Sequence, residues 1–397
     1  MRQKERAAAQ ENKTASGAAG KGRLFTVLFA LCLLAALALF IAAPERLLSE
    51  PENRLLQTRP EVSADAVFSG SWQKDWEAYL SDQFPGRDEL TAFASVIRKT
   101  AGQKDIGGAW LADDGFYPEV HTADSFDTAA FSKNLSYVGG FAEKFPGSSS
   151  ALLLIPDAAC VYRDRLPALA EPYDAEALQK LAEELLPGMR VPDLTAAFLD
   201  AVQSGPAASL SEDSSNSELY FRTDHHWSAA GVQLAYDLLM NGEGSYQGSP
   251  ELFSDSFLGS TYSKTLDPAA KPEELYIFPA AEGITVTADG EEISLYDLSA
   301  ADKKDKYTVF FGGNYGLVTI QTPAGTGKSL LVIKDSFANS LAPLLTADYD
   351  TITMVDLRYF GGSAASLAAM TQPDQILFVY SMSNLEQGSE LVKLLLP

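Results

Sequence analysis

The stretch KSLLVIKDSFANSLAPLL, residues 328–345, decides the fold class of this chain. Its first half is a run of branched aliphatic residues typical of a buried strand, and its second half has the apolar spacing of a helix. Asp335 and Ser336 stand at the junction between the two. A serine at the carboxyl end of a parallel strand can expose its Oγ beside free backbone N–H groups that stabilise an oxyanion. The pattern makes Ser336 a candidate nucleophile, and the alternative is that one of the two residues is only a helix N-cap.

The rest of the chain from about residue 90 repeats this alternation of strands and helices. Short apolar runs predict strands at 151–156, 329–335, 351–356 and 375–380, and helical patterns occupy 90–101, 127–144, 175–186 and 228–240. This order predicts an α/β fold, in which helices cover both faces of a parallel sheet. Residues 241–325 differ, because they are rich in Gly, Pro, Asp and Ser and contain ITVTADGEEISLY at 284–296, whose Asp289-Gly290 pair suits a tight hairpin. We interpret them as a β-rich insertion.

The N-terminal region predicts a membrane anchor. Residues 24–43, LFTVLFALCLLAALALFIAA, form an unbroken apolar run that spans roughly 30 Å as a helix. The preceding tail is basic, so the positive-inside rule places residues 1–23 in the cytoplasm and everything after the anchor outside. Residues 44–89 are then an extracellular stalk with a short helix, and 90–397 form the main domain. A cleaved signal peptide is the alternative, although its apolar region is normally only about 7 to 15 residues long.

The charge and the cysteines restrict the function further. The formal charge is −23, and it resides entirely in the part outside the membrane, since the tail and the anchor are basic. A body this acidic repels nucleic-acid phosphates, which argues against binding to DNA or RNA. Cys32 lies in the anchor and Cys160 is alone outside, so the pattern predicts no intramolecular disulfide.

The stretch TDHHWSAAG, residues 223–231, carries the second candidate site. Asp224 and His226 precede a predicted helix for which Ser228 is a good N-cap. A carboxylate that accepts a hydrogen bond from one imidazole nitrogen leaves the other facing a nucleophile, which is the base half of a serine hydrolase or acyltransferase. Three alternatives stay open: His226 bonds only to backbone, the His-Asp group binds a metal, or His225 is the base instead. The metal reading lacks the usual ligand spacing, so we expect no metal and no cofactor.

Several motifs in the same order resemble a known family, the bacterial DHHW proteins, which are similar to the SGNH-like alginate O-acetyltransferases. The motifs are ENR (52–54), SDQFPGR (81–87), TDHHWSAAG (223–231), FLGSTYSKT (257–265), KDKYTVFFGGN (304–314), LLVIKDSFANSLAPLL (330–345) and VDLRYF (355–360). The resemblance implies an SGNH-hydrolase-like, flavodoxin-like domain. It also implies that Asp224 and His226 are the Asp-x-His pair and Ser336 the nucleophile. One departure is Lys334, which replaces the Gly of the Gly-Asp-Ser motif of ordinary SGNH enzymes.

The resemblance also implies a reaction. His226 would deprotonate Ser336, which would take an acetyl group supplied across the membrane by a membrane-bound O-acyltransferase and pass it to a sugar hydroxyl of an extracellular polysaccharide. Arg358, Tyr380 and Asn339 are the candidates to bind the substrate or the oxyanion, while a surface Arg and a core Tyr are the alternatives. An extracellular esterase and a non-catalytic scaffold for surface-polymer assembly are the other function classes.

Overall fold

The computed structural model describes residues 23–205 and 218–396. The chain divides into two compact units, Met1–Phe93 and Ala94–Pro397, and the division falls within helix α4 (Arg87–Thr100). The first unit contains the helix Arg23–Ala42, which has a mean hydropathy of 2.9 and is long and apolar enough to cross a membrane. This helix coincides with the segment predicted as an anchor, within one residue at each end.

The rest of the first unit is built on a small hairpin and short helices. Strands β1 (Leu48–Ser49) and β2 (Arg54–Leu55) pair antiparallel, and helices α2 (Ala64–Ser69) and α3 (Ser71–Asp82) follow. Gly70 has a φ of +80° and separates the two helices. The sequence predicts one short helix in the stalk, but the structure has two, and Phe68 of α2 is 91% exposed. The left-handed Gly70 turns the chain between them, and Trp72 and Trp76 of α3 stack on each other.

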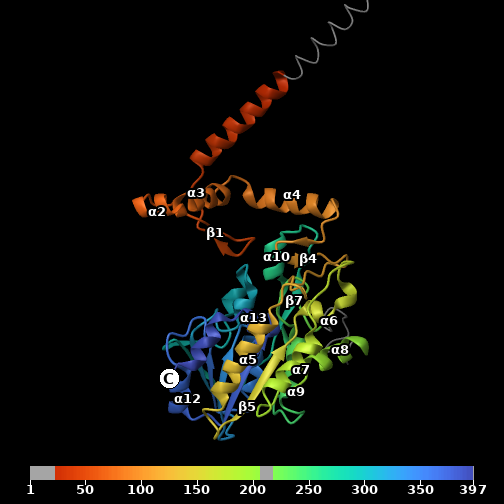
Figure 1. Ribbon diagram of the computed structural model, residues 1–397, viewed down its shortest axis with the longest axis vertical. Helices are drawn as coiled ribbons and strands as arrows, with labels where there is room; N and C mark the ends of the chain where they lie inside the picture. Colours follow the sequence, from red (N-terminus) through yellow and green to blue (C-terminus); the bar gives the residue numbers. More distant parts are fainter. Residues whose placement is uncertain (1–22, 206–217, 397) are drawn as a thin grey trace, which may run out of the picture. The chain divides into compact units, whose positions relative to one another are not determined.

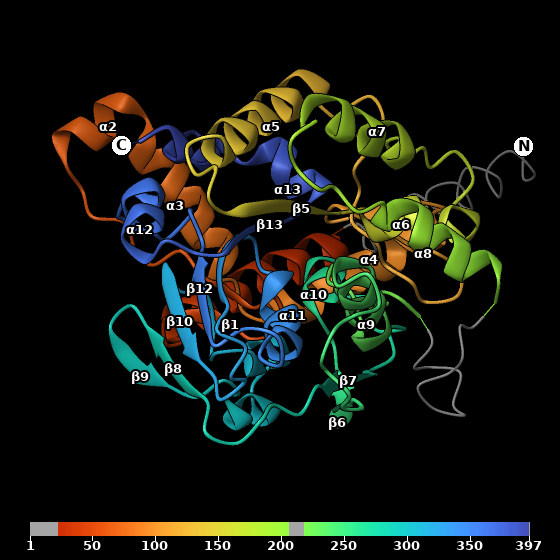
Figure 2. The ribbon, with the colours of Figure 1, turned by 90° about the horizontal axis from the view of Figure 1, so that it is seen from below.

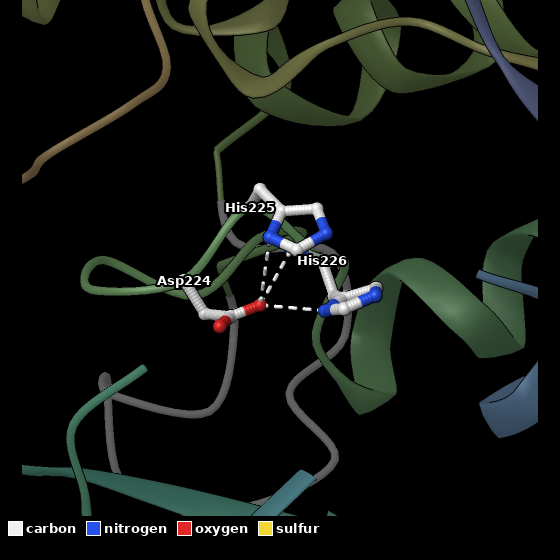
Figure 3. Close-up of side chains that lie close together, drawn as sticks. All are labelled: Asp224, His225 and His226. Atoms are coloured by element: carbon white, nitrogen blue, oxygen red, sulfur yellow. Dashed lines mark hydrogen bonds and ion pairs between the residues drawn. The ribbon is translucent and has the colours of Figure 1, made fainter. Parts of the chain in front are cut away.

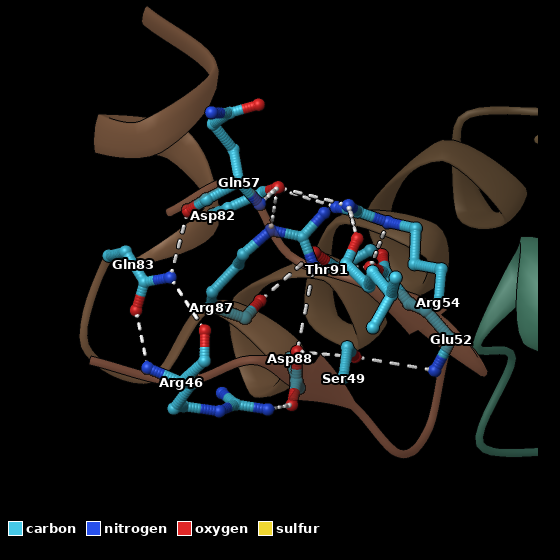
Figure 4. Close-up of polar contacts among 11 residues, drawn as sticks. Arg46, Ser49, Glu52, Arg54, Gln57, Asp82, Gln83, Arg87, Asp88 and Thr91 are labelled. Atoms are coloured by element: carbon cyan, nitrogen blue, oxygen red, sulfur yellow. Dashed lines mark hydrogen bonds and ion pairs between the residues drawn. The ribbon is translucent and has the colours of Figure 1, made fainter. Parts of the chain in front are cut away.

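Two of the family motifs meet in this unit in one polar network (Figure 4). Arg54 of the ENR motif donates to both carboxylate oxygens of Asp82, at 3.0 and 2.5 Å. Arg87 of the SDQFPGR motif lies 2.6 Å from the carboxylate of Glu52. Bidentate pairs between arginine and carboxylate fix orientation as well as adding energy. Both motifs are therefore accounted for by the folding of this unit.

The second unit is organised around a seven-stranded sheet with the order β5-β13-β11-β12-β10-β8-β9. Four strands pair in parallel: β5 (Ser149–Ile155), β13 (Gln375–Ser381), β11 (Ser329–Lys334) and β12 (Thr351–Val355). They are the four strands predicted from the apolar runs. Three antiparallel strands extend the sheet beyond β12: β10 (Leu317–Gln321), β8 (Thr285–Ala288) and β9 (Glu291–Ile293).

The β-rich segment predicted at 241–325 is thus only partly an insertion. Its first half pairs β6 (Glu251–Phe257) with β7 (Glu273–Ile277) in a separate sheet, but its second half supplies the antiparallel edge of the main sheet. Asp289 and Gly290 form the predicted two-residue turn between β8 and β9, with φ values of +48° and +94°. The sheet is therefore mixed and not purely parallel.

Two hydrophobic cores lie on the two faces of the sheet, as expected for an α/β fold. Alternate residues of one strand enter different cores: Val332 belongs to one and Ile333 to the other. The first core takes side chains from α8 (Leu194–Gln203), α9 (Ala229–Leu239) and α11 (Ala338–Leu345). The second takes them from α5 (Thr128–Ala142), α7 (Ala175–Leu185), α12 (Ala364–Thr371) and α13 (Met382–Gln387). Figure 2 shows α5 and α7 on one side of the sheet and α9 and α11 on the other.

Smaller elements complete the second unit. They are β3 (Asp105–Ile106) and β4 (Ala109–Trp110), the short helices α6 (Ala158–Val161) and α10 (Ser260–Thr265), and several 3-10 turns, among them Lys306–Val309. Figure 1 shows α10 and β4 close together near one end of the sheet. The parallel strands β5, β11, β12 and β13 end at one common edge, and the loops after this edge carry the chemically reactive side chains.

Candidate active site

The loop before α9 holds Asp224 and His226 in a tight reversal of the chain. Tyr220 and Trp227 form an antiparallel bridge across it, and the Phe221 N–H donates to the carbonyl of His226 at 3.2 Å. Ser228 is the predicted N-cap, since its side chain accepts from the Gly231 N–H. Because both ends of the loop are fixed, the side chains of Asp224 and His226 have little conformational freedom.

Asp224, His226 and Ser336 form a hydrogen-bonded line. His226 Nδ1 lies 2.6 Å from Asp224 Oδ1, and His226 Nε2 lies 2.8 Å from Ser336 Oγ. The two residues come together although 110 positions separate them in the sequence. A carboxylate on Nδ1 favours the tautomer in which Nδ1 carries the proton, so Nε2 is free to accept the proton of the Ser336 hydroxyl.

Asp224 is held by further donors that fix its orientation. Its Oδ1 also accepts from the His226 N–H at 2.9 Å, and its Oδ2 accepts from the Ser260 N–H at 2.7 Å. Figure 3 shows one oxygen of the carboxylate facing both histidines. Both oxygens accept hydrogen bonds, and the carboxylate cannot rotate away from the imidazole without losing several of them.

Ser336 lies at the turn between β11 and α11, as the sequence predicts. It is the one partly exposed residue in the run 330–345, and every other residue of that run is buried. Asp335 fixes the turn, because its carboxylate accepts from the N–H groups of Phe337 and Ser381 and from Asn384 Nδ2 at 2.8–3.0 Å. Within the described residues the Ser336 N–H makes no hydrogen bond. This N–H is a candidate donor to an oxyanion.

Burial and neighbouring charges set the protonation of the dyad. Burial alone would raise the pKa of Asp224, but His225, His226 and the Ser260 N–H outweigh it and hold this pKa well below its usual range. Burial and the adjacent His225 lower the pKa of His226, and Asp224 offsets only part of that shift. At neutral pH the pair is therefore an ionised carboxylate beside a neutral imidazole, which is the state that a general base requires.

Tyr307 and Gly259 complete the surroundings of His226 and Asp224, and the sequence analysis assigned a role to neither of them. The ring of Tyr307 stacks on the imidazole, with centroids 3.8 Å apart and planes 8° from parallel. The Tyr307 hydroxyl donates to Ser340, which also accepts from Trp227 Nε1 at 2.8 Å. Tyr307 belongs to the KDKYTVFFGGN motif at residues 304–314. Its contact with the imidazole joins segments far apart in the sequence, so the motif alone does not predict it.

Gly259 provides the space that Asp224 occupies. A Cβ on Gly259 would lie 2.3 Å from the Asp224 Cβ and 2.4 Å from its Oδ2. Contacts that short force one of the two groups to move. The FLGSTYSKT motif thus contributes both the space for the carboxylate at Gly259 and the N–H that binds it at Ser260.

Replacing Gly259 by alanine tests this fit. We expect Gly259→Ala to displace the Asp224 carboxylate, to lower any reaction that uses His226 as a base by about tenfold or more, and to destabilise the fold by about 1–3 kcal/mol. Thermal unfolding and the rate of ester cleavage measure the two effects. Gly140→Ala is the control, because a Cβ there has nothing within 4 Å. Equal activity of Gly259→Ala and the wild type would contradict the proposed crowding.

The structure also answers the question of His225. Its Nδ1 lies 2.7 Å from Ser260 Oγ, and its ring lies 3.9 Å from that of His226, while the hydrogen bond to Ser336 Oγ is made by His226 Nε2. His226 is therefore the imidazole that meets the serine. Asp224, His225 and His226 bring ligand atoms within 4.8 Å of one another, as a metal site would. The same atoms are hydrogen bonded to each other, to Ser260 and to Ser336, which accounts for their arrangement without a metal.

The three residues proposed for substrate binding lie elsewhere. Asn339 is 4% exposed, with its oxygen 2.8 Å from Lys334 Nζ and its amide 3.2 Å from Asn314. Arg358 makes a bidentate pair with Asp356, and Tyr380 is 1% exposed within the second core. None of the three lines the cavity next to Ser336, which is bounded by Asn384 and others. Their role in substrate binding therefore stays a prediction, and the structure adds that the residue parity of β13 turns Tyr380 into the core and that Asp356 holds the guanidinium of Arg358.

Lys334 departs from the Gly-Asp-Ser pattern and has a structural explanation. Its side chain is 2% exposed and lies 3.5 Å from the fully buried Asp356. Burial lowers the pKa of Lys334, and Asp356 works against that shift. A buried charge is tolerated only with a close partner, and Asp356 and Asn339 provide it here.

Two family models match parts of this chain. Residues 207–355 match the family model described as DHHW protein. The chain carries the DHHW region. This region includes Asp224, His226 and Ser336, and residues 110–248 match a second model, the SGNH hydrolase-like domain of acetyltransferase AlgX. The resemblance to both families is confirmed. No curated protein matches the sequence.

Solved structures agree with the fold. A DHHW family protein from Eubacterium siraeum is 20% identical, with a TM-score of 0.58, and the match covers 73% of this chain and 95% of that one. Bacillus cereus PatB1, solved with a sulfonyl adduct, is 19% identical, with a TM-score of 0.56, and the match covers 71% of this chain and 96% of that one. These structures show that the chain has the same α/β fold, and residues 110–248 are similar to an SGNH hydrolase-like acetyltransferase domain.

Proposed function

We propose that the chain is a membrane-anchored O-acyltransferase that moves an acetyl group through Ser336 to a hydroxyl of a cell-surface or secreted polysaccharide. The observation that carries the proposal is the hydrogen-bonded line Asp224–His226–Ser336, with links of 2.6 and 2.8 Å. The match to an acetyltransferase domain favours acyl transfer among the reactions that such a line performs. The basic tail before the helix Arg23–Ala42 favours a cytoplasmic N-terminus with the DHHW region outside.

The reaction has two steps that share one base. In the first, His226 Nε2 takes the Ser336 proton while Oγ attacks the acetyl carbon of the donor, and the donor's leaving group departs with that proton. In the second, a sugar hydroxyl attacks the acetyl-serine, His226 takes the hydroxyl proton, and the bond from Oγ to the acetyl carbon breaks. Ser336 then recovers its proton from His226. The Ser336 N–H donates to the oxyanion in both tetrahedral intermediates.

In this proposal a partner supplies the acetyl group, because a donor made in the cytoplasm would have to cross the membrane to reach Ser336 on the outside. We propose a membrane-bound O-acyltransferase in that role, with the polysaccharide as acceptor. Neither an organic cofactor nor a metal is needed for the two steps above, since each moves only an acyl group and a proton.

The test uses the full-length chain in detergent micelles with 4-nitrophenyl acetate as an activated donor and a neutral oligosaccharide as acceptor. We expect an acetyl group on Ser336 by mass spectrometry of peptides, followed by acetylated oligosaccharide. A sulfonyl fluoride is expected to form an adduct on the same serine. Acetate release without any acetylated sugar would indicate an esterase instead. If neither 4-nitrophenyl acetate nor the sulfonyl fluoride modifies Ser336, the proposal is overturned and a non-catalytic scaffold becomes the favoured function.

The pH dependence gives a separate prediction. The general base must be unprotonated, and the pKa of His226 is lowered from its ordinary value of about 6.5. Activity therefore persists as the pH falls through 6.5 and declines only below it. We expect the acid limb of the pH profile of kcat/KM for 4-nitrophenyl acetate to have its midpoint below 6.5. A midpoint above 7 would show that His226 is not the base or that its surroundings differ.

A further inference from the structure

A cavity of about 130 Å³ lies next to the candidate nucleophile. Its wall includes Phe337, which follows Ser336, and His225, which precedes His226. Asn384 also lines it and donates to Asp335, the residue before Ser336. The cavity is therefore lined by the residue that follows Ser336 and by a residue hydrogen-bonded to the one that precedes it.

Asp157 contributes an unsatisfied buried oxygen to this cavity. The residue is 9% exposed, and its Oδ1 accepts from Ser383 Oγ at 2.9 Å. Its Oδ2 is buried and has no hydrogen-bond partner among the described residues. The nearest cation is His121, whose Nε2 lies 3.9 Å away, beyond hydrogen-bond reach. A buried carboxylate oxygen without a donor is costly, and a donor on a bound molecule would remove that cost.

Glu119 adds a second carboxylate to the same wall. Lys264 donates a hydrogen bond to Glu119, and His121 Nε2 lies 3.4 Å from Glu119 Oε2. Lys264 and His121 do not line the cavity. Burial favours the neutral form of Glu119, but His121, His225 and Lys264 outweigh it and hold the pKa of Glu119 below its ordinary value. The cations therefore keep an ionised carboxylate at the cavity wall.

The wall chemistry selects among possible ligands. The groups facing the cavity include the carboxyl groups of Asp157 and Glu119, the oxygens of Ser381, Ser383 and Asn384, and the imidazole of His225. Burial raises the pKa of Asp157, so Glu119 is the ionised carboxylate of this wall. Sugar hydroxyls donate to acceptor oxygens of this kind, and most strongly to an ionised carboxylate. A ligand carboxylate would meet the like charge of Glu119 in a poorly solvated space, which is unfavourable. The volume is several times what a water molecule needs and accommodates part of a sugar ring.

We propose that this cavity is the acceptor subsite and that it takes a neutral, hydroxyl-rich sugar, which donates to Asp157 and Glu119, while sugars that carry a carboxylate are excluded. The inference rests on the proposed function for the word acceptor, but the sugar preference is a binding property that does not depend on acyl transfer. The link to acyl transfer is the position of Phe337 and His225 in the cavity wall, since these residues are the chain neighbours of Ser336 and His226.

The test measures binding to full-length Ser336→Ala protein in detergent micelles, so that no acyl chemistry takes place. A neutral gluco-oligosaccharide and an oligogalacturonate of the same length are the two probes, and calorimetry gives the dissociation constants. We expect the neutral sugar to bind at least tenfold more tightly than the uronate. Adding Asp157→Asn is expected to weaken binding of the neutral sugar about tenfold, and Glu119→Gln to weaken it by a smaller factor.

Two controls separate binding from folding. Asp374→Asn makes the same change at the opposite end of the strands, before β13, and we expect it to leave both dissociation constants unchanged. The melting temperature of Asp157→Asn is expected to be no lower than that of its parent, because the substitution removes a buried acid whose ionised form is disfavoured by burial. Equal affinity for the two sugars, no binding of either, or no effect of both acidic substitutions would overturn the subsite. Failure of acyl transfer alone would overturn the proposed function and leave the binding result standing.

Discussion

Ser336→Ala is expected to lower acetyl transfer by about 10³- to 10⁶-fold and to leave the fold unchanged. The loss is this large because the hydroxyl forms the covalent intermediate, so no other group in the line can replace it. The residual rate would come from the oxyanion donor and from substrate binding. The Ser336 side chain is partly exposed, and among the described residues its Oγ bonds only to His226. Removing the hydroxyl therefore leaves one protein group without its partner, which is His226 Nε2.

The measurement is the acetyl content of the surface polysaccharide in cells that carry either the wild type or Ser336→Ala, with protein levels checked by immunoblot. Ser132→Ala on α5 is the matched control, since Ser132 is a partly exposed serine, like Ser336, whose hydroxyl donates to the Thr128 carbonyl of its own helix. We expect the acetyl content to fall in the first variant and to stay constant in the second. A full acetyl content with Ser336→Ala present would sink the nucleophile assignment.

The sequence predicted the parts of this site that depend on local pattern. The strand at 329–335 and the helix after it place Ser336 at a strand end, and the Ser228 N-cap places Asp224 and His226 in a helix-entry loop. Each of these inferences needs only a few neighbouring residues. The carboxyl edge of the parallel strands then brings the two segments to the same place, which the α/β pattern implies.

The residues that sequence reasoning missed or misplaced depend on long-range packing. Tyr307 stacks on His226 from a segment with no regular pattern, and Gly259 is small because Asp224 fills its space. Tyr380 shows the opposite case. The parity of β13 assigns Phe378 and Tyr380 to one face, but which face meets the cavity becomes known only from the pairing of the strand.

Arg358 illustrates how a partner close in sequence can hold a candidate side chain. Its guanidinium lies 2.7–2.9 Å from both oxygens of Asp356, two residues earlier. Asp356 also accepts from the buried Lys334, so one carboxylate supports two cations. This cluster explains why a lysine can stand where ordinary SGNH enzymes have glycine: the side chain turns inward to Asp356 and leaves Ser336 accessible.

Asp224→Asn is expected to reduce acetyl transfer by about 10⁴-fold, which is the second large effect. The carboxylate accepts two N–H groups of His226 on Oδ1 and the Ser260 N–H on Oδ2. An asparagine offers one oxygen and one NH₂ group, so either His226 or Ser260 must face a donor. If the oxygen turns to Ser260, the NH₂ group faces Nδ1 and stabilises the tautomer with the proton on Nε2, which cannot accept the Ser336 proton.

The stopped-flow burst of 4-nitrophenol from 4-nitrophenyl acetate, recorded from pH 5 to pH 9, measures this effect. The conservative control is Asp237→Asn on α9, where the carboxylate is exposed and bonds only Gln233 among the described residues. We expect the Asp224→Asn burst to be slow across the neutral range, because the fault is the tautomer and not a shifted pKa. A burst as fast as that of Asp237→Asn would mean that Asp224 only supports the loop, and the general base would then act without an orienting carboxylate.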